Sequence, residues 1–178
     1  MTEQPVQPRR VSILNAGASN WLWLSLVVLA LDQWSKLWIR NTFTQFQERA
    51  LLPFLDIVRW HNEGAAWSLL SDAGGWQRWF FICLGSGVSL AIVIWLRRLP
   101  DRGQGRVAAG LALILAGALG NVVDRINLGY VVDFIKVHYR DEWVFPAFNF
   151  ADSAITIGAA LLILDSILNY GKGESAGS

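Results

Sequence analysis

The sequence of 178 residues contains one cysteine, two histidines and few charged side chains. A single cysteine, Cys83, excludes an intrachain disulfide and any metal cluster built from several thiolates. Two histidines, His61 and His138, do not supply a multi-histidine metal site, and we expect no metal. The formal net charge of +1 gives no broad basic surface, so we expect no nucleic-acid partner.

Charged residues make up 16% of the chain and hydrophobic residues 53%, whereas a soluble domain has roughly a quarter of its residues charged. The apolar residues are gathered into long runs, each near the ~20 residues that a bilayer crossing needs. The sequence therefore predicts a membrane all-α fold with a small β element, formed by residues 1–178 as a single membrane domain. Four transmembrane helices are expected at about 21–39, 79–96, 107–123 and 149–168, with Pro146 near the start of the last one.

Basic residues indicate which side of the membrane each segment occupies. The loop between the second and third predicted spans carries four arginines: Arg97, Arg98, Arg102 and Arg106. The positive-inside rule places this loop in the cytoplasm. Four spans then put both termini in the cytoplasm, including a flexible tail at 1–20, and leave segments 41–75 and 126–148 outside.

The two outer segments contain β-forming residues as well as charges. In segment 41–75, Phe54 to Trp60 suit a small sheet followed by a turn at 62–64, although an interfacial loop fits the spacing equally well. Segment 126–148 suits either a short interfacial helix or a pair of strands, and the sequence does not choose between them.

Two aspartates, Asp133 and Asp152, stand in the short polar stretches VVDF and FNFADS, beside segments apolar enough to enter a membrane. An ionisable residue at membrane depth is costly and is by default a functional hypothesis. When two carboxyl groups lie together, one holds a proton while the other is charged. The charged one can activate a water and the neutral one can donate to a scissile carbonyl, which is aspartic peptidase chemistry.

Other polar residues accompany the pair. Asn149 is three residues before Asp152 and shares its helical face, while Asn121 and Arg125 lie at the outer end of the third span. Asp32 and Lys36, at i and i+4 in the first span, suit a structural ion pair.

Three other functions compete with the aspartic peptidase. A proton-coupled small transporter is the main alternative, because it would employ membrane aspartates as a relay. A non-catalytic scaffold leaves the carboxylates unexplained. A serine peptidase built on Ser68 or Ser153 with a histidine has no G-x-S-x-G motif.

Five motifs in this order resemble those of the bacterial lipoprotein signal peptidase (signal peptidase II) family: LDQWSK at 31–36, HNEGAAWS at 61–68, LGNVVDR at 119–125, VVDF at 131–134 and FNFADSAI at 148–155. The resemblance implies four transmembrane helices, an extracytoplasmic β-cradle and a short periplasmic helix. It implies an aspartic endopeptidase without a cofactor, which cleaves prolipoproteins just before the diacylglyceryl-modified cysteine.

Residue by residue, the resemblance implies that Asp133 and Asp152 are catalytic. It assigns substrate-binding or supporting roles to Asn62, Gly64, Asn121, Arg125 and Asn149, and a structural pair to Asp32 and Lys36. Asp124, beside Arg125, is expected to be structural, and Glu63 and Trp67 depart from the usual motif and affect the shape of the cradle. The implied partners are the lipid-modified substrate and membrane lipids, with the chain a monomer in the inner membrane and its active site at the periplasmic face.

Overall fold

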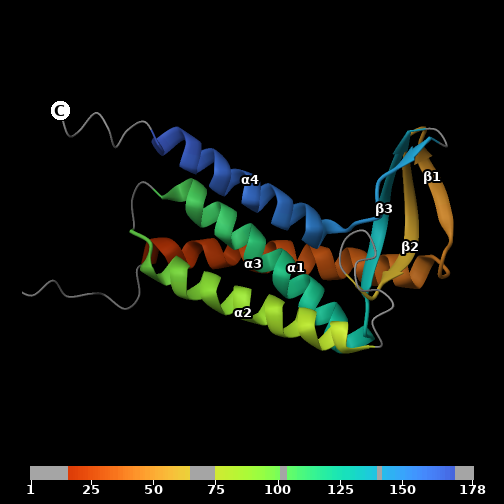
Figure 1. Cartoon of the computed structure of the whole chain (residues 1–178), viewed down its shortest axis with the longest axis horizontal. Helices are drawn as coiled ribbons and strands as arrows, with labels where there is room; N and C mark the ends of the chain where they lie inside the picture. Colours follow the sequence, from red (N-terminus) through yellow and green to blue (C-terminus); the bar gives the residue numbers. More distant parts are fainter. Residues whose placement is uncertain (1–15, 65–74, 101–103, 140–141, 171–178) are drawn as a thin grey trace, which may run out of the picture.

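The computed structural model describes residues 16–64, 75–100, 104–139 and 142–170. Four long helices run side by side along one direction: α1 (Ala16–Thr42), α2 (Trp76–Arg98), α3 (Gly105–Leu128) and α4 (Phe150–Tyr170) (Figure 1). Each is long and apolar enough to cross a membrane, as the sequence predicted. Two segments expected outside the spans are helical instead. Residues 16–20, expected in the flexible tail, belong to α1, and residues 126–128 continue α3, which ends at Leu128 and is followed by Gly129 with a left-handed φ of 88°.

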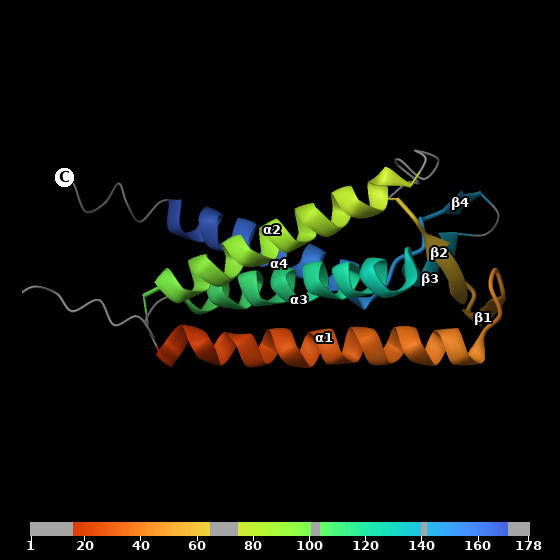
Figure 2. The ribbon, with the colours of Figure 1, turned by 90° about the horizontal axis from the view of Figure 1, so that it is seen from below.

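Helix α3 lies at the centre of the bundle and packs against each of the other three helices. Figure 2 shows α2 leaning away from α1, with α3 between them. The contact between α3 and α4 is close because both helices have glycines there. A Cβ on Gly110 would lie 2.8 Å from the carbonyl oxygen of Gly158, and one on Gly117 would overlap the carbonyl oxygen of Ala151. Small residues thus bring the two backbones together.

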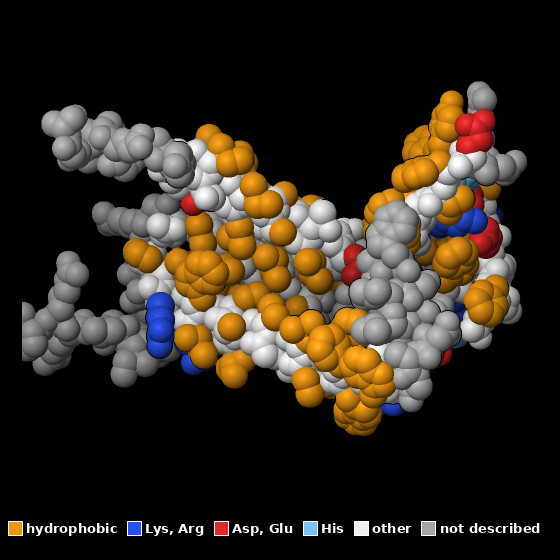
Figure 3. Space-filling view, viewed as in Figure 1, with side chains coloured by type: hydrophobic (Ala, Val, Ile, Leu, Met, Phe, Trp, Pro, Cys, Tyr) orange, Lys and Arg blue, Asp and Glu red, His pale blue; other side chains and the backbone are white. Residues whose placement is uncertain are grey.

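The outer faces of the helices carry large exposed apolar side chains, among them Trp23, Trp34, Trp79 and Ile167. Figure 3 shows hydrophobic side chains spread over the helices, with basic side chains at the end away from the sheet and also on the sheet. An apolar surface of this extent suits contact with lipid and not with water. The fold is therefore that of a multi-pass membrane protein.

A four-stranded antiparallel sheet stands at one end of the bundle (Figure 1). Its strands, in spatial order, are β1 (Glu48–Leu52), β2 (Leu55–Asn62), β3 (Val131–Tyr139) and β4 (Trp143–Val144). In segment 41–75, β1 and β2 form a hairpin, so the expectation of a small sheet is confirmed over that of a loop. In segment 126–148, β3 and β4 are strands, which decides the choice that the sequence left open. The expected short periplasmic helix has no counterpart among the described elements, and residues 65–74, with Trp67 and Ser68, lie outside the described residues.

The sheet is fixed to the bundle by an apolar cluster at the outer end of α1. Ile39 and Phe43 of this region pack with Val132 and Phe134 of β3, and all four side chains are buried. Asp133 lies between the two β3 residues, so the cluster also fixes the height of its backbone. In this way the packing of α1 on β3 sets one half of the candidate site.

The glycine contacts between α3 and α4 lead to a prediction about stability. We expect Gly117→Ala to lower the free energy of unfolding by roughly 1–3 kcal/mol, because its methyl group meets the backbone of α4. Gly87→Ala in α2 is the matched control, because a Cβ there meets no atom within 4 Å. Thermal unfolding in detergent micelles measures both variants, and equal unfolding temperatures for the two would contradict the close approach.

Candidate active site

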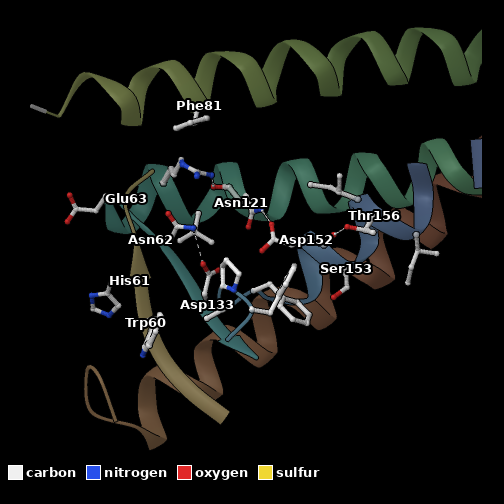
Figure 4. A pocket seen from close by; sticks show the side chains of 18 residues that line it. Trp60, His61, Asn62, Glu63, Phe81, Asn121, Asp133, Asp152, Ser153 and Thr156 are labelled. Carbon is white, nitrogen blue, oxygen red and sulfur yellow. Dashed lines mark hydrogen bonds between the residues drawn. The ribbon is translucent and has the colours of Figure 1, made fainter. Parts of the chain in front are cut away.

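A cleft of about 750 Å³ lies where the sheet meets the helices (Figure 4). Its walls come from β2, α2, α3, β3, the segment 145–148 and the first turns of α4. Figure 3 shows the hollow between α4 and the sheet, with acidic side chains near its base. Five of the expected site residues line the cleft: Asn62, Asn121, Arg125, Asp133 and Asp152.

Asp133 is held in the floor of the cleft with only 3% of its surface exposed. The side-chain amide of Asn62 donates to its Oδ2 at 3.0 Å, and that of Asn149 donates to its Oδ1 at 2.7 Å. Burial, and then the nearby charge of Asp152, raise the pKa of Asp133 to about 7, although the hydrogen bonds from Asn62 and Asn149 act to lower it. Asp133 therefore holds a proton more readily than an ordinary carboxyl group.

Asp152 is positioned by the start of α4. Asn149 is the N-cap: its Oδ1 accepts from the backbone N–H of Asp152 at 3.0 Å, and Asp152 Oδ2 accepts from the backbone N–H of Asn149 at 3.2 Å. This reciprocal pair is a capping box. The helix thus begins at Phe150, and the expectation that Pro146 stands in its first turn is wrong.

Three asparagines connect the two aspartates, and both ends of each amide are used. In Asn62 the oxygen accepts from the Gly64 N–H at 3.0 Å, and in Asn121 it accepts from Lys36 Nζ at 3.0 Å. Asn121 Nδ2 then donates to Asp152 Oδ1 at 2.8 Å. Because each oxygen faces an unambiguous donor, each NH₂ group must face a carboxylate.

A cluster of buried charges lies behind the cleft. Lys36 Nζ is 2.9 Å from Asp32 and 3.1 Å from Asp124, and all three side chains are nearly inaccessible. Gln33 Nε2 donates to both carboxylates. Asp32 also accepts from the backbone N–H of Ala151 in α4 at 2.9 Å. The pair Asp32–Lys36 thus joins α1 to α3 and to the first turn of α4.

Asp124 belongs to this cluster and does not line the cleft. Its Oδ2 accepts from the backbone N–H of Val132 at 3.2 Å, in addition to the ion pair with Lys36. The carboxylate therefore joins the end of α3 to the start of β3, which agrees with the structural role expected for it.

Arg125 lines the cleft from the last turn of α3. Its Nη2 donates to the carbonyl oxygen of Gly64 at 2.7 Å, and its guanidinium lies 4.8 Å from the ring centre of Phe81 in α2. Gly64 thereby accepts from Arg125 and donates to Asn62. These contacts join the end of β2 to α3.

Sequence reasoning missed two residues that shape the site. Arg78 of α2 donates to the carbonyl oxygens of Arg125 at 2.8 Å and Ile126 at 2.9 Å, and so caps the end of α3. Gln33 holds the two buried carboxylates. The only sequence signal for Arg78 was its place as a basic residue in the first turn of an apolar helix. The only signal for Gln33 was its place in the LDQWSK motif.

The described residues give no support to serine or metal chemistry. The Ser153 hydroxyl donates to the carbonyl oxygen of Asn149 at 3.0 Å, while His61 stacks on Tyr130 with ring centres 3.8 Å apart. His138 lies 3.3 Å from Asp56 on the sheet. Among the residues that the structure describes, no group of three or more His, Cys, Asp or Glu side chains is arranged to hold a metal ion.

Comparisons with known proteins decide the family. The model of the family described as signal peptidase (SPase) II matches residues 24–168. The lipoprotein signal peptidase of Pseudomonas fluorescens (strain Pf0-1) is 49% identical over 162 residues, which cover 89% of this chain and 94% of that protein. The chain belongs to the signal peptidase II family. It is therefore a membrane peptidase of the aspartic class.

Further members of the signal peptidase II family agree. The lipoprotein signal peptidase of Acinetobacter baumannii (strain ATCC 17978) is 53% identical over 147 residues, 82% of each chain. A solved bacterial membrane enzyme, determined by the in meso method at 2.3 Å resolution, is similar with a TM-score of 0.74 and 31% identity, covering 86% of this chain and 91% of that one. The fold as well as the sequence thus matches related proteins.

The buried charge cluster predicts that Lys36 is essential for stability. Lys36→Met leaves Asp32 and Asp124 buried without a cation, and we expect a loss of roughly 3–5 kcal/mol of unfolding free energy. Lys136→Met is the matched control, since Lys136 pairs with the more exposed Glu48 on the sheet and should lose about 0–1 kcal/mol. Thermal unfolding in micelles compares the two, and a Lys36 variant as stable as the control would show that the cluster is not needed.

Proposed function

We propose that this signal peptidase II removes the signal peptide from prolipoproteins by cleaving before the diacylglyceryl-modified cysteine, with Asp133 and Asp152 as its catalytic pair. The observation that carries the proposal is that both aspartates line one cleft, at the end of four lipid-spanning helices, and are linked through asparagine amides. The family comparisons favour this reaction over the proton-coupled transporter.

The two aspartates would have different roles, because one is protonated and the other is charged. Asp133, whose pKa is raised to about 7 by burial and by the charge of Asp152, holds the proton. The Asp152 carboxylate then takes a proton from a water as the water oxygen attacks the carbonyl carbon of the scissile peptide bond. Asp133 donates its proton to the carbonyl oxygen, which gives a neutral gem-diol. As the C–N bond breaks, the proton on Asp152 passes to the leaving nitrogen and one hydroxyl of the gem-diol returns a proton to Asp133.

The asparagines and Arg125 would orient the reacting groups and the substrate backbone. Asn62 and Asn149 each donate to a different oxygen of Asp133, so the carboxyl plane is fixed before substrate binds. Arg125 and Gly64 stand at the rim, where Arg125 holds the end of β2 against α3. We expect the asparagines, Arg125 and Gly64 to position the reacting groups and not to transfer protons.

The walls of the cleft suit a lipid-bearing substrate. Phe81 of α2 lines one side, and Ile155 and Ile157 of α4 line another, so apolar side chains extend from the dyad toward the lipid-facing surface. Acyl chains of the substrate can therefore remain in lipid while the peptide bond reaches the aspartates. We infer lateral entry between α2 and α4.

The charge distribution supports an orientation in the inner membrane. Arg97 and Arg98 end α2 and Arg106 begins α3, all at the end of the bundle opposite the sheet. The positive-inside rule favours the cytoplasm for that end and for both termini. The cleft would then lie at the periplasmic face, in a protein that we expect to act as a monomer.

Replacing either aspartate tests the pair. We expect Asp133→Asn and Asp152→Asn each to reduce cleavage at least about a hundredfold while the protein remains folded, because an amide cannot accept or donate the transferred proton. A gel-shift assay with diacylglyceryl-modified prolipoprotein, and the unmodified form beside it, measures the loss. Asp56→Asn, outside the cleft on β2, is the matched control and should cleave normally; substantial turnover by either dyad variant would exclude the proposed roles.

The raised pKa of Asp133 predicts a pH dependence. The reaction needs one proton on the pair, and that proton is lost as the pH rises through about 7. We therefore expect kcat/KM to fall by roughly tenfold per pH unit above that value. Cleavage of the lipid-modified substrate measured across neutral and alkaline pH gives the profile, with unfolding temperatures taken at each pH to show that the protein remains folded. If kcat/KM stays constant into the alkaline range, Asp133 does not carry the proton that the reaction needs.

A further inference from the structure

Two arginines meet at the outer end of α1, away from the cleft. Arg40 stands in the last turn of α1, and Arg59 reaches it from β2. Arg59 Nη1 donates to the carbonyl oxygen of Arg40 at 3.1 Å and to that of Phe43 at 2.8 Å. Arg59 therefore caps the helix at the turn that carries Arg40.

Neither arginine has an acidic partner within the described part of the chain. The ion pairs formed there use Lys36, Arg106 and Lys136 as cations, and His138 lies 3.3 Å from Asp56. The effect of the two charges reaches His61, whose pKa is lowered by burial first and then by Arg59 and Arg40. The carboxyl end of α1 supplies only about half a negative charge, so the region keeps a net positive charge of more than one.

The position of the arginines along α1 corresponds to the membrane interface. Trp34 and Trp38, in the turns before Arg40, are 66% and 50% exposed, and Phe46, just after the helix, is 70% exposed. Exposed aromatic side chains at the end of a membrane helix mark the level of lipid headgroups. Arg40 and Arg59 are thus at the depth of lipid phosphates.

We propose that Arg40 and Arg59 bind the phosphate of an anionic phospholipid in the outer leaflet and so hold the sheet against the membrane. The two guanidinium groups complement a phosphate that carries net negative charge, and a zwitterionic headgroup would satisfy them less well. Arg59 is three residues before Asn62 on the same strand. A lipid bound here would therefore steady the strand whose end contacts Asp133.

Titration with lipid tests the site without relying on peptidase activity. The full chain in zwitterionic micelles is titrated with phosphatidylglycerol or with phosphatidylcholine, and bound lipid is counted by native mass spectrometry. We expect tighter binding of phosphatidylglycerol, and a rise of roughly fivefold in its Kd for Arg40→Gln. Arg40→Gln leaves the hydrogen bonds of Arg59 to the backbone of α1 in place. If that variant does not fold, Arg40→Met gives the same test, because it also removes the charge of Arg40 and leaves Arg59 unaltered.

Arg97→Gln is the matched control, because it removes the same charge at the opposite end of the bundle. Its Kd for phosphatidylglycerol should equal that of the unaltered chain. An unchanged Kd in the folded Arg40 variant, or an equal loss in the Arg97 variant, would overturn the proposal. Equal affinity of the unaltered chain for the two lipids would overturn it as well.

Discussion

Placing carboxylates beside lipid requires a hydrogen-bond donor for each oxygen, and the arrangement of this protein follows from that requirement. Asp133 receives two asparagine amides, and Asp152 receives one amide and a backbone N–H. An asparagine suits this task because it gives a donor without adding a positive charge, which would keep the carboxyl group ionised. The pKa of Asp133 can therefore stay high, although both of its oxygens are hydrogen-bonded.

The central position of α3 makes this network possible. Its small residues admit the backbone of α4 on one side, and its Asn121 stands between Lys36 of α1 and Asp152 of α4. A larger residue at Gly117 would push α4 outward and lengthen the bond from Asn121 to Asp152. The close packing of α3 against α4 is therefore also what sets the hydrogen-bond geometry between Asn121 and Asp152.

The parts of this structure that depend on local patterns could be predicted from the sequence. The four spans follow from hydropathy, and Asp133 and Asp152 stood out as charges among apolar residues. The strands of 126–148 could not be predicted, because β3 is specified by pairing with β2, whose partner residues lie 69 to 82 positions earlier. The role of Gln33 also escaped prediction, since its partner Asp124 lies 91 residues away in the chain. Proline and asparagine both signal a helix start, and here the asparagine cap decides it: α4 begins at Phe150, close to the expected residue 149, and Pro146 lies before the helix.

The site lies at the end of the bundle because helix ends supply what the site needs. At the start of α4, backbone N–H groups donate to Asp32 and Asp152, and at the end of α3 the carbonyl oxygens of Arg125 and Ile126 accept from Arg78. In mid-helix the N–H groups are already paired within the helix, so they could not have held the same carboxylates. The residues that terminate the helices are thus the residues that build the cleft, and the stability of the helix ends and the geometry of the dyad cannot be varied separately.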